Sequence, residues 1–121
     1  MSDLQTAATE STGVASTAAT IALPLVLVAD ADGTSRARRA DELRDRGFRV
    51  AVARTPFEAI VKASCHLPNL ILLDASLGAE EVDLTSQLLA TCPTTAHFPV
   101  VRLTPRRRVP RAMLRSLAAA L

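Results

Sequence analysis

The sequence predicts a single α/β domain built on a doubly wound parallel sheet, and two observations carry that prediction. Four short apolar runs alternate with four polar or amphipathic segments between residues 23 and 121. The apolar runs do not alternate between apolar and polar residues, as a half-exposed strand would. Such continuous apolar runs are typical of strands covered on both faces. Strands that alternate with helices indicate right-handed crossovers and a parallel sheet.

The element boundaries follow from capping and turn residues. Either Asp32 or Thr34 can cap the first helix, and Gly47 is a typical stop after it. Thr55 and Glu58 form a capping box with a proline between them, which predicts the start of the second helix. Strands are predicted over residues 23–29, 48–53, 69–73 and 98–103, and helices over residues 35–46, 56–67, 80–91 and from Pro110 onward.

Three of the helices carry apolar residues at helical spacing, as helices that pack on a sheet do. These residues are Phe57, Ile60 and Val61 in the second helix, Val82, Leu84, Leu88 and Leu89 in the third, and Met113, Leu114, Leu117 and Leu121 in the last.

The ends of the chain differ in composition from its middle. Residues 1–20 are rich in Ala, Ser and Thr and have no apolar period, so we expect a disordered leader before a domain over residues 21–121. The leader has no basic region of the kind that opens a signal peptide. The apolar run 21–29 is far shorter than the roughly 20 residues of a membrane helix. We therefore expect a cytoplasmic protein without a membrane segment.

Charge and cysteine content exclude several classes of protein. The net charge of +2 is too small to imply a nucleic-acid partner. The run Arg106-Arg-Arg108 is expected to be a solvated loop rather than a contact with an acidic partner. Cys65 and Cys92 match neither a disulfide framework nor a CxxC motif, which favours reduced, buried thiols.

Polar residues follow three of the four predicted strands. Asp30 and Asp32 come after the first strand, Asp74 after the third and Thr104 after the fourth. In an open parallel sheet the carboxyl ends of the strands gather the functional groups at one edge. Carboxylates that close repel one another unless a cation lies among them, and oxygen ligands suit Mg²⁺. A carboxylate beside Mg²⁺ can act as a nucleophile toward a phosphoryl group.

These strand ends resemble the receiver domain of two-component response regulators. Val26-Leu-Val-Ala-Asp-Ala-Asp32 with Arg36 is similar to the family's first strand and acidic cluster. Pro68-Asn-Leu-Ile-Leu-Leu-Asp74 is similar to its phosphoacceptor strand, and Phe98-Pro-Val-Val-Arg-Leu-Thr104 to its fourth strand. The resemblance covers residues 23 to about 121 and implies a flavodoxin-like fold with four of the usual five βα units.

The resemblance implies a signalling function rather than an enzyme. Asp74 would accept a phosphoryl group from a histidine kinase or a phosphotransfer protein in a phosphorelay. Asp30 would help to hold Mg²⁺ beside Asp74, with Asp32 as a substitute for the family's second acid, and Thr104 would be the switch hydroxyl that moves toward the phosphoryl group.

Several positions depart from the family pattern. The family has two adjacent acids after the first strand, where this chain has Asp30 and Ala31. Pro105 replaces a small residue whose backbone N–H helps to bind the phosphoryl group, and proline has no N–H. Gly78 lies where the family usually has proline. The family's fifth strand, its Lys-Pro pair and its last helix are missing. The fourth strand is therefore an edge. We expect this edge, together with the last helix of this chain, to be open to a second copy or another partner.

These departures keep other interpretations open. The chain can be a degenerate pseudo-receiver that acts as a phosphorylation-independent protein-interaction module, or a truncated regulator. Asp30 and Asp32 can be simple turn or capping acids, and Thr104 a strand residue without a role. Cys65, His66, Cys92 and His97 are zinc-binding residue types, but their spacing matches no ordinary zinc site.

Overall fold

The computed structural model describes residues 23–104 and 111–119 of the chain. The predicted leader, Pro105, the arginine run Arg106–Arg108 and Leu121 lie outside the described residues.

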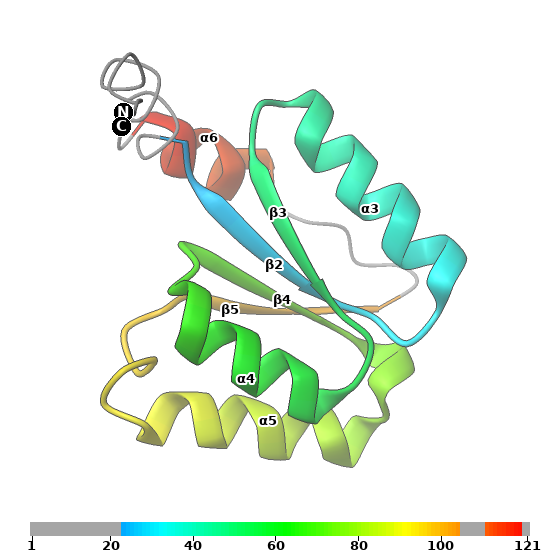
Figure 1. Ribbon diagram of the computed structural model, residues 1–121, viewed down its shortest axis with the longest axis vertical. Helices are drawn as coiled ribbons and strands as arrows, with labels where there is room; N and C mark the ends of the chain where they lie inside the picture. Colours follow the sequence, from blue (N-terminus) through cyan, green and yellow to red (C-terminus); the bar gives the residue numbers. More distant parts are fainter. Residues whose placement is uncertain (1–22, 105–110, 120–121) are drawn as a thin grey trace, which may run out of the picture.

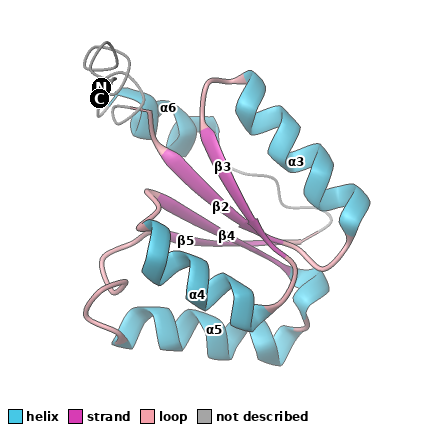
Figure 2. Ribbon diagram, viewed as in Figure 1, coloured by secondary structure: helices cyan, strands magenta, loops and turns pink. Residues whose placement is uncertain are grey.

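The described residues form an open four-stranded sheet with helices on both faces (Figures 1 and 2). The strands lie in the order β3-β2-β4-β5, and every neighbouring pair is parallel. This arrangement confirms the predicted doubly wound α/β fold with β5 at one edge. The strands are β2 (Leu25–Ala29), β3 (Arg49–Ala53), β4 (Leu70–Asp74) and β5 (Val100–Leu103).

Two helices cover each face of the sheet. Val26, Val28 and Leu72 point to one face, where they pack with Leu43 and Leu114. The residues between them point to the other face, as the pleat of a strand requires. The helices are α3 (Gly33–Asp45) and α6 (Arg111–Ala119) on the first face, with α4 (Pro56–His66) and α5 (Ala79–Thr91) on the second, and a short 3₁₀ helix η1 (Ala75–Leu77) follows β4.

The helix boundaries largely agree with the capping signals in the sequence. Thr55 Oγ1 accepts the Glu58 N–H at 3.1 Å at the start of α4, and Gly47 follows the end of α3 with a φ of 94°. Asp32 is the N-cap of α3, but its side chain makes no capping hydrogen bond. Thr34 lies inside the helix, so it is not the cap.

Helices α4 and α5 do not bury all of the apolar residues that lie at helical spacing in the sequence. The buried residues of α4 are Ala59 and Ala63, whereas Phe57 is 76% exposed. In α5 the predicted Val82 and Leu89 are buried, but Leu84 and Leu88 are 58% and 53% exposed. Small side chains let a helix lie close to the sheet within a densely packed interior. Alanine therefore occupies the centre of the inner face of α4, with Ile60 packed beside it, and Phe57 is left at the surface.

The two cysteines are free thiols, as predicted, but the prediction that they are buried is wrong. Cys65 lies on the outer side of α4 and Cys92 at the end of α5, and both are exposed. Among the described residues, no helix is long and apolar enough to span a bilayer.

Candidate functional site

Asp30 lies in the turn that follows β2, and its side chain is completely buried. Its Oδ1 accepts the Ser76 hydroxyl at 2.8 Å and the Asp32 N–H at 2.9 Å. Its Oδ2 is buried and has no hydrogen-bond partner. A buried carboxylate oxygen without a donor is costly, so it marks a position where a cation is favourable.

Asp74 is the last residue of the neighbouring strand β4, and its side chain is only 13% exposed. Its Oδ2 accepts the Ser76 N–H at 2.9 Å, which caps η1. Its Oδ1 accepts Nη2 of Arg39 at 3.0 Å. The two carboxylates therefore meet at one edge of the sheet, as the alignment of β2 and β4 predicts.

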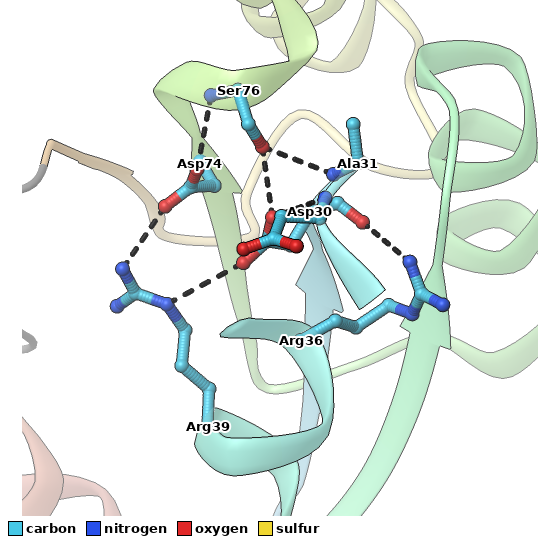
Figure 3. Close-up of polar contacts among 7 residues, drawn as sticks. Asp30, Ala31, Arg36, Arg39, Asp74 and Ser76 are labelled. Carbon is cyan, nitrogen blue, oxygen red and sulfur yellow. Dashed lines mark hydrogen bonds and ion pairs between the residues drawn. The ribbon is translucent and has the colours of Figure 1, made fainter. Parts of the chain in front are cut away.

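Arg39 connects the two carboxylates from α3 (Figure 3). Besides its hydrogen bond to Asp74, its Nε lies 3.7 Å from Asp30 Oδ2. Both of these atoms are buried, and neither has a hydrogen-bond partner. The guanidinium thus lies between the two acids and balances part of their charge. We call Asp30, Asp74, Ser76 and Arg39 the acid cluster.

Ser76 and Arg36 fix the backbone around the acid cluster. Ser76 Oγ accepts the Ala31 N–H at 3.0 Å while it donates to Asp30. Arg36 Nη1 donates to the backbone oxygen of Asp30 at 2.9 Å. The two Ser76 bonds join the turn after β2 to the turn after β4, and the Arg36 bond joins the turn after β2 to α3, as Figure 3 shows.

The electrostatic balance at Asp30 favours its ionised form. Burial alone raises the pKa of this carboxyl group, but the nearby Ser35 hydroxyl, the hydrogen bonds from Ser76 and the Asp32 backbone, and the Arg39 charge outweigh burial. The net result is a pKa below the ordinary value of 3.8. Asp30 is therefore a carboxylate at neutral pH.

Of the predicted site residues, the structure brings Asp30 and Asp74 together and leaves Asp32 apart. Asp32 is exposed, and its backbone N–H rather than its carboxylate contacts Asp30. No group of three or more His, Cys, Asp or Glu side chains able to hold a metal occurs in the described part of the chain.

Thr104 follows β5, one residue beyond the position paired with Asp74. It is exposed and lines an open, mainly apolar pocket of about 260 Å³ between β4, β5 and α5. Leu73, Val82 and Arg102 also line this pocket. The predicted switch hydroxyl thus follows the end of β5, the strand that neighbours β4 and its Asp74.

The residues of the acid cluster do not fit a conventional Mg²⁺ site well. Mg²⁺ prefers near-octahedral oxygen ligands, usually one or two carboxylates with water. Asp30 Oδ2 is suitable, but it faces Arg39, and both oxygens of Asp74 already accept hydrogen bonds. Ala31 provides no side-chain ligand, and Asp32 is turned to solvent.

The fold of this chain is similar to that of many solved receiver domains. The N-terminal domain of a response regulator receiver protein from Methanoculleus marisnigri JR1 is 25% identical, with a TM-score of 0.65, and the match covers 79% of each chain. The chain has the receiver-domain fold. No family model and no curated protein matches the sequence.

Two further receivers show the same fold. The receiver domain of a signal transduction histidine kinase from Syntrophus aciditrophicus is 24% identical, with a TM-score of 0.62, over 78% of this chain and 70% of that one. The chemotaxis response regulator CheY4 of Vibrio cholerae is 20% identical, with a TM-score of 0.64, over 78% and 80%. Receiver domains are signalling modules and are not generally classed as enzymes.

Two residues of the acid cluster were not predicted from the sequence. Ser76 follows Asp74 by two residues, and serine at that spacing is a typical turn residue, which gives a weak signal. Arg39 is one of several arginines on a polar helix, and nothing in the spacing distinguishes it from Arg38. Its role depends on the angle at which α3 crosses the sheet.

Proposed function

We propose that this chain is a receiver-like signalling module that acts in the cytoplasm through protein contacts and does not depend on phosphorylation. One observation carries the proposal: two carboxylates, rather than three, converge on the acid cluster. Ala31 and the exposed Asp32 leave the metal site of a typical receiver incomplete.

A charge count supports the same conclusion. Asp30, Asp74 and Arg39 together carry a charge of −1. A phosphoryl group on Asp74 would replace one negative charge with two and bring the acid cluster to −2. Metal ions normally neutralise this charge in phosphoryl transfer, and here a metal would have few protein ligands.

The other groups that could offset the added negative charge of a phosphoryl group, a lysine and a backbone N–H, contribute little. Lys62 is the only lysine of the chain. Its Nζ donates a hydrogen bond to the Val52 backbone oxygen at 2.6 Å, so it joins α4 to β3. Pro105 has no N–H with which to bind a phosphoryl oxygen.

Two features of the surface support a role in protein binding. Phe57 and Val61 on α4 are exposed, as are Leu84 and Leu88 on the adjacent α5. Exposed apolar side chains that gather on neighbouring elements are typical of interaction sites. The edge strand β5 offers a second route for a partner or a second copy, because strand edges carry backbone groups able to pair.

Beryllofluoride, a phosphoryl mimic, tests the proposal directly. Amide NMR spectra of the full chain are recorded with Mg²⁺ alone and then with Mg²⁺ and beryllofluoride, and Asp74→Asn is the matched control. We expect no site-specific shifts at Asp74 and Thr104. Saturable shifts at both residues that vanish in the control would reject a phosphorylation-independent module.

A second candidate function is a working phosphoacceptor on Asp74, served by a histidine kinase or a phosphotransfer protein. The observation that favours it is the Arg39 guanidinium, a cation within hydrogen-bonding distance of the acceptor carboxylate. This function predicts Mg²⁺-dependent labelling by acetyl phosphate. A label that is lost in Asp74→Asn would establish it, and an unlabelled, folded wild-type chain would exclude it.

A further inference from the structure

We infer that the Arg39 guanidinium is the resident cation of the acid cluster and excludes a divalent metal ion from the space between Asp30 and Asp74. This inference deepens the proposed function, on which it rests, because it explains how the receiver fold keeps its two buried acids without Mg²⁺.

The contacts place Arg39 where a bridging ion would have to bind. Asp74 Oδ1 accepts Nη2 of Arg39 at 3.0 Å, and Asp30 Oδ2 lies 3.7 Å from its Nε. The other oxygen of each carboxylate is already occupied by Ser76. A metal ion that bridges the acids therefore needs the same two oxygens that face the guanidinium, and Mg²⁺ would require them at about 2.0–2.1 Å.

Arg39 is well suited to remain in place. It lies one residue before Ala40, which is buried with Leu43 on the face of α3 that packs on the sheet. Its side chain is only 15% exposed. A guanidinium keeps its charge at any physiological pH and presents several donors in one plane. It can therefore interact with two carboxylates at once.

The neighbouring basic residues do not share this role. Arg36 reaches the acid cluster only through the backbone oxygen of Asp30. Arg38 is exposed on the same helix. Among the residues that the structure describes, Arg39 alone forms ion pairs with Asp30 and Asp74.

Titration with Mn²⁺ and Mg²⁺ tests the inference in matched variants. Arg39→Gln removes the resident cation, and Arg38→Gln removes the same charge from the exposed neighbouring position. Binding is followed by amide NMR shifts with Mg²⁺ and line broadening with Mn²⁺ at residues 30 and 74. We expect Arg39→Gln to bind either ion at least about tenfold more tightly than Arg38→Gln, because a repelling charge is removed near the site. Equal affinity in the two variants would overturn the inference.

A measurement on the wild-type chain keeps the inference testable if Arg39→Gln does not fold. The side-chain ¹⁵N signals of Arg39 report rotation of its guanidinium. We expect restricted rotation that persists when Mg²⁺ is added and becomes faster in Asp74→Asn. An Arg39 signal that rotates as freely as that of Arg38 would overturn the inference.

The outcomes separate this inference from the proposed function. Acetyl phosphate labelling of wild type at Asp74 would reject the proposed function, whatever the metal affinities of the variants. Equal metal affinities in Arg39→Gln and Arg38→Gln, with no labelling of wild type, would reject the inference alone.

Discussion

The hydroxyl group of Ser76 donates a hydrogen bond of 2.8 Å to the buried carboxylate of Asp30, 46 residues earlier in the chain. The same oxygen accepts the Ala31 N–H at 3.0 Å. One side chain therefore ties the turn after β4 to the turn after β2, and it does so at the centre of the acid cluster. The two central strands are held in register at this edge by polar contacts as well as by the sheet.

Replacement of Ser76 by alanine should lower the free energy of unfolding by about 1–2 kcal/mol, because Asp30 Oδ1 and the Ala31 N–H each lose a partner. Urea unfolding measures the change. Ser64→Ala, at an exposed position of α4, is the control and should change stability by less than about 0.5 kcal/mol. Equal effects of the two substitutions would show that the Ser76 bonds add no net stability.

The ion pair between Arg39 and Asp74 should contribute to the free energy of unfolding, and the contribution should appear as a coupling energy between the two side chains. Each single change, Arg39→Gln or Asp74→Asn, removes one partner of a mostly buried pair. We expect Arg39→Gln to cost about 2–4 kcal/mol, because Asp30 and Asp74 then lie together without a cation. A double-mutant cycle should give a coupling energy of about 1–3 kcal/mol. Strictly additive effects would mean that the pair is not formed in solution.

The stability should fall at acidic pH as Asp30 is protonated. Burial opposes ionisation, but the hydrogen bonds and the Arg39 charge hold its folded-state pKa below the ordinary value of 3.8. A depressed pKa contributes stability that is fully present above the unfolded-state pKa and is lost as the pH falls through the folded-state pKa. Urea midpoints measured from about pH 6 down to about pH 2 should show this loss. Asp30→Asn should make the urea midpoint depend less steeply on pH in this range. An unchanged pH dependence would contradict the assignment of the acid-induced loss of stability to Asp30.

The fold was predictable because its signals are local and repeated. Residues of β2, and of β4 up to Leu73, are apolar without alternation, and both strands are buried along their whole length. Thr55 and Gly47 mark helix ends through backbone chemistry that does not depend on tertiary contacts. Such signals can be read from a single sequence, so the predicted ends of the helices and strands agree with the structure to within one or two residues.

The inner faces of the helices were harder to predict. Phe57 and Val61 follow the apolar period of α4 but are exposed, whereas Ala59 and Ala63 lie against the sheet. The distance between a helix and a sheet decides whether alanine or a larger residue fits, and this distance is a property of the whole packing.

The acid cluster was predictable only in part, for a related reason. Asp30 and Asp74 follow strands whose ends must meet, so their proximity follows from topology. Arg39 reaches them from another element, and its contacts depend on the placement of α3 and on one side-chain rotamer. Asp32 is only two residues from Asp30, yet its carboxylate is exposed because the chain has already turned into α3.

Gly78 should not tolerate proline, the residue that the resemblance to receiver domains would place there. Its φ is 103°, and the proline ring holds φ near −65°. We expect Gly78→Pro to cost at least about 2 kcal/mol, because the turn between η1 and α5 must rearrange. Thermal unfolding measures the effect. Gly33→Ala is the control, since its added Cβ would meet only the end of the Arg36 side chain at 3.6 Å, and a proline variant as stable as this control would contradict the turn geometry.

A third carboxylate should make the acid cluster responsive to Mg²⁺. By its resemblance to the receiver family, the chain has Ala31 in place of a second acid, and the Ala31 backbone N–H already contacts Ser76. In Ala31→Asp the metal still has to compete with the Arg39 guanidinium for the carboxylates, so we expect only a small gain in Mg²⁺ affinity. The double variant Ala31→Asp with Arg39→Gln should gain more than the sum of the two single changes, because one adds a ligand and the other removes the competing cation. Mg²⁺ titration by amide NMR measures all four proteins. Strictly additive changes in binding free energy would show that residue 31 and Arg39 act on the metal independently.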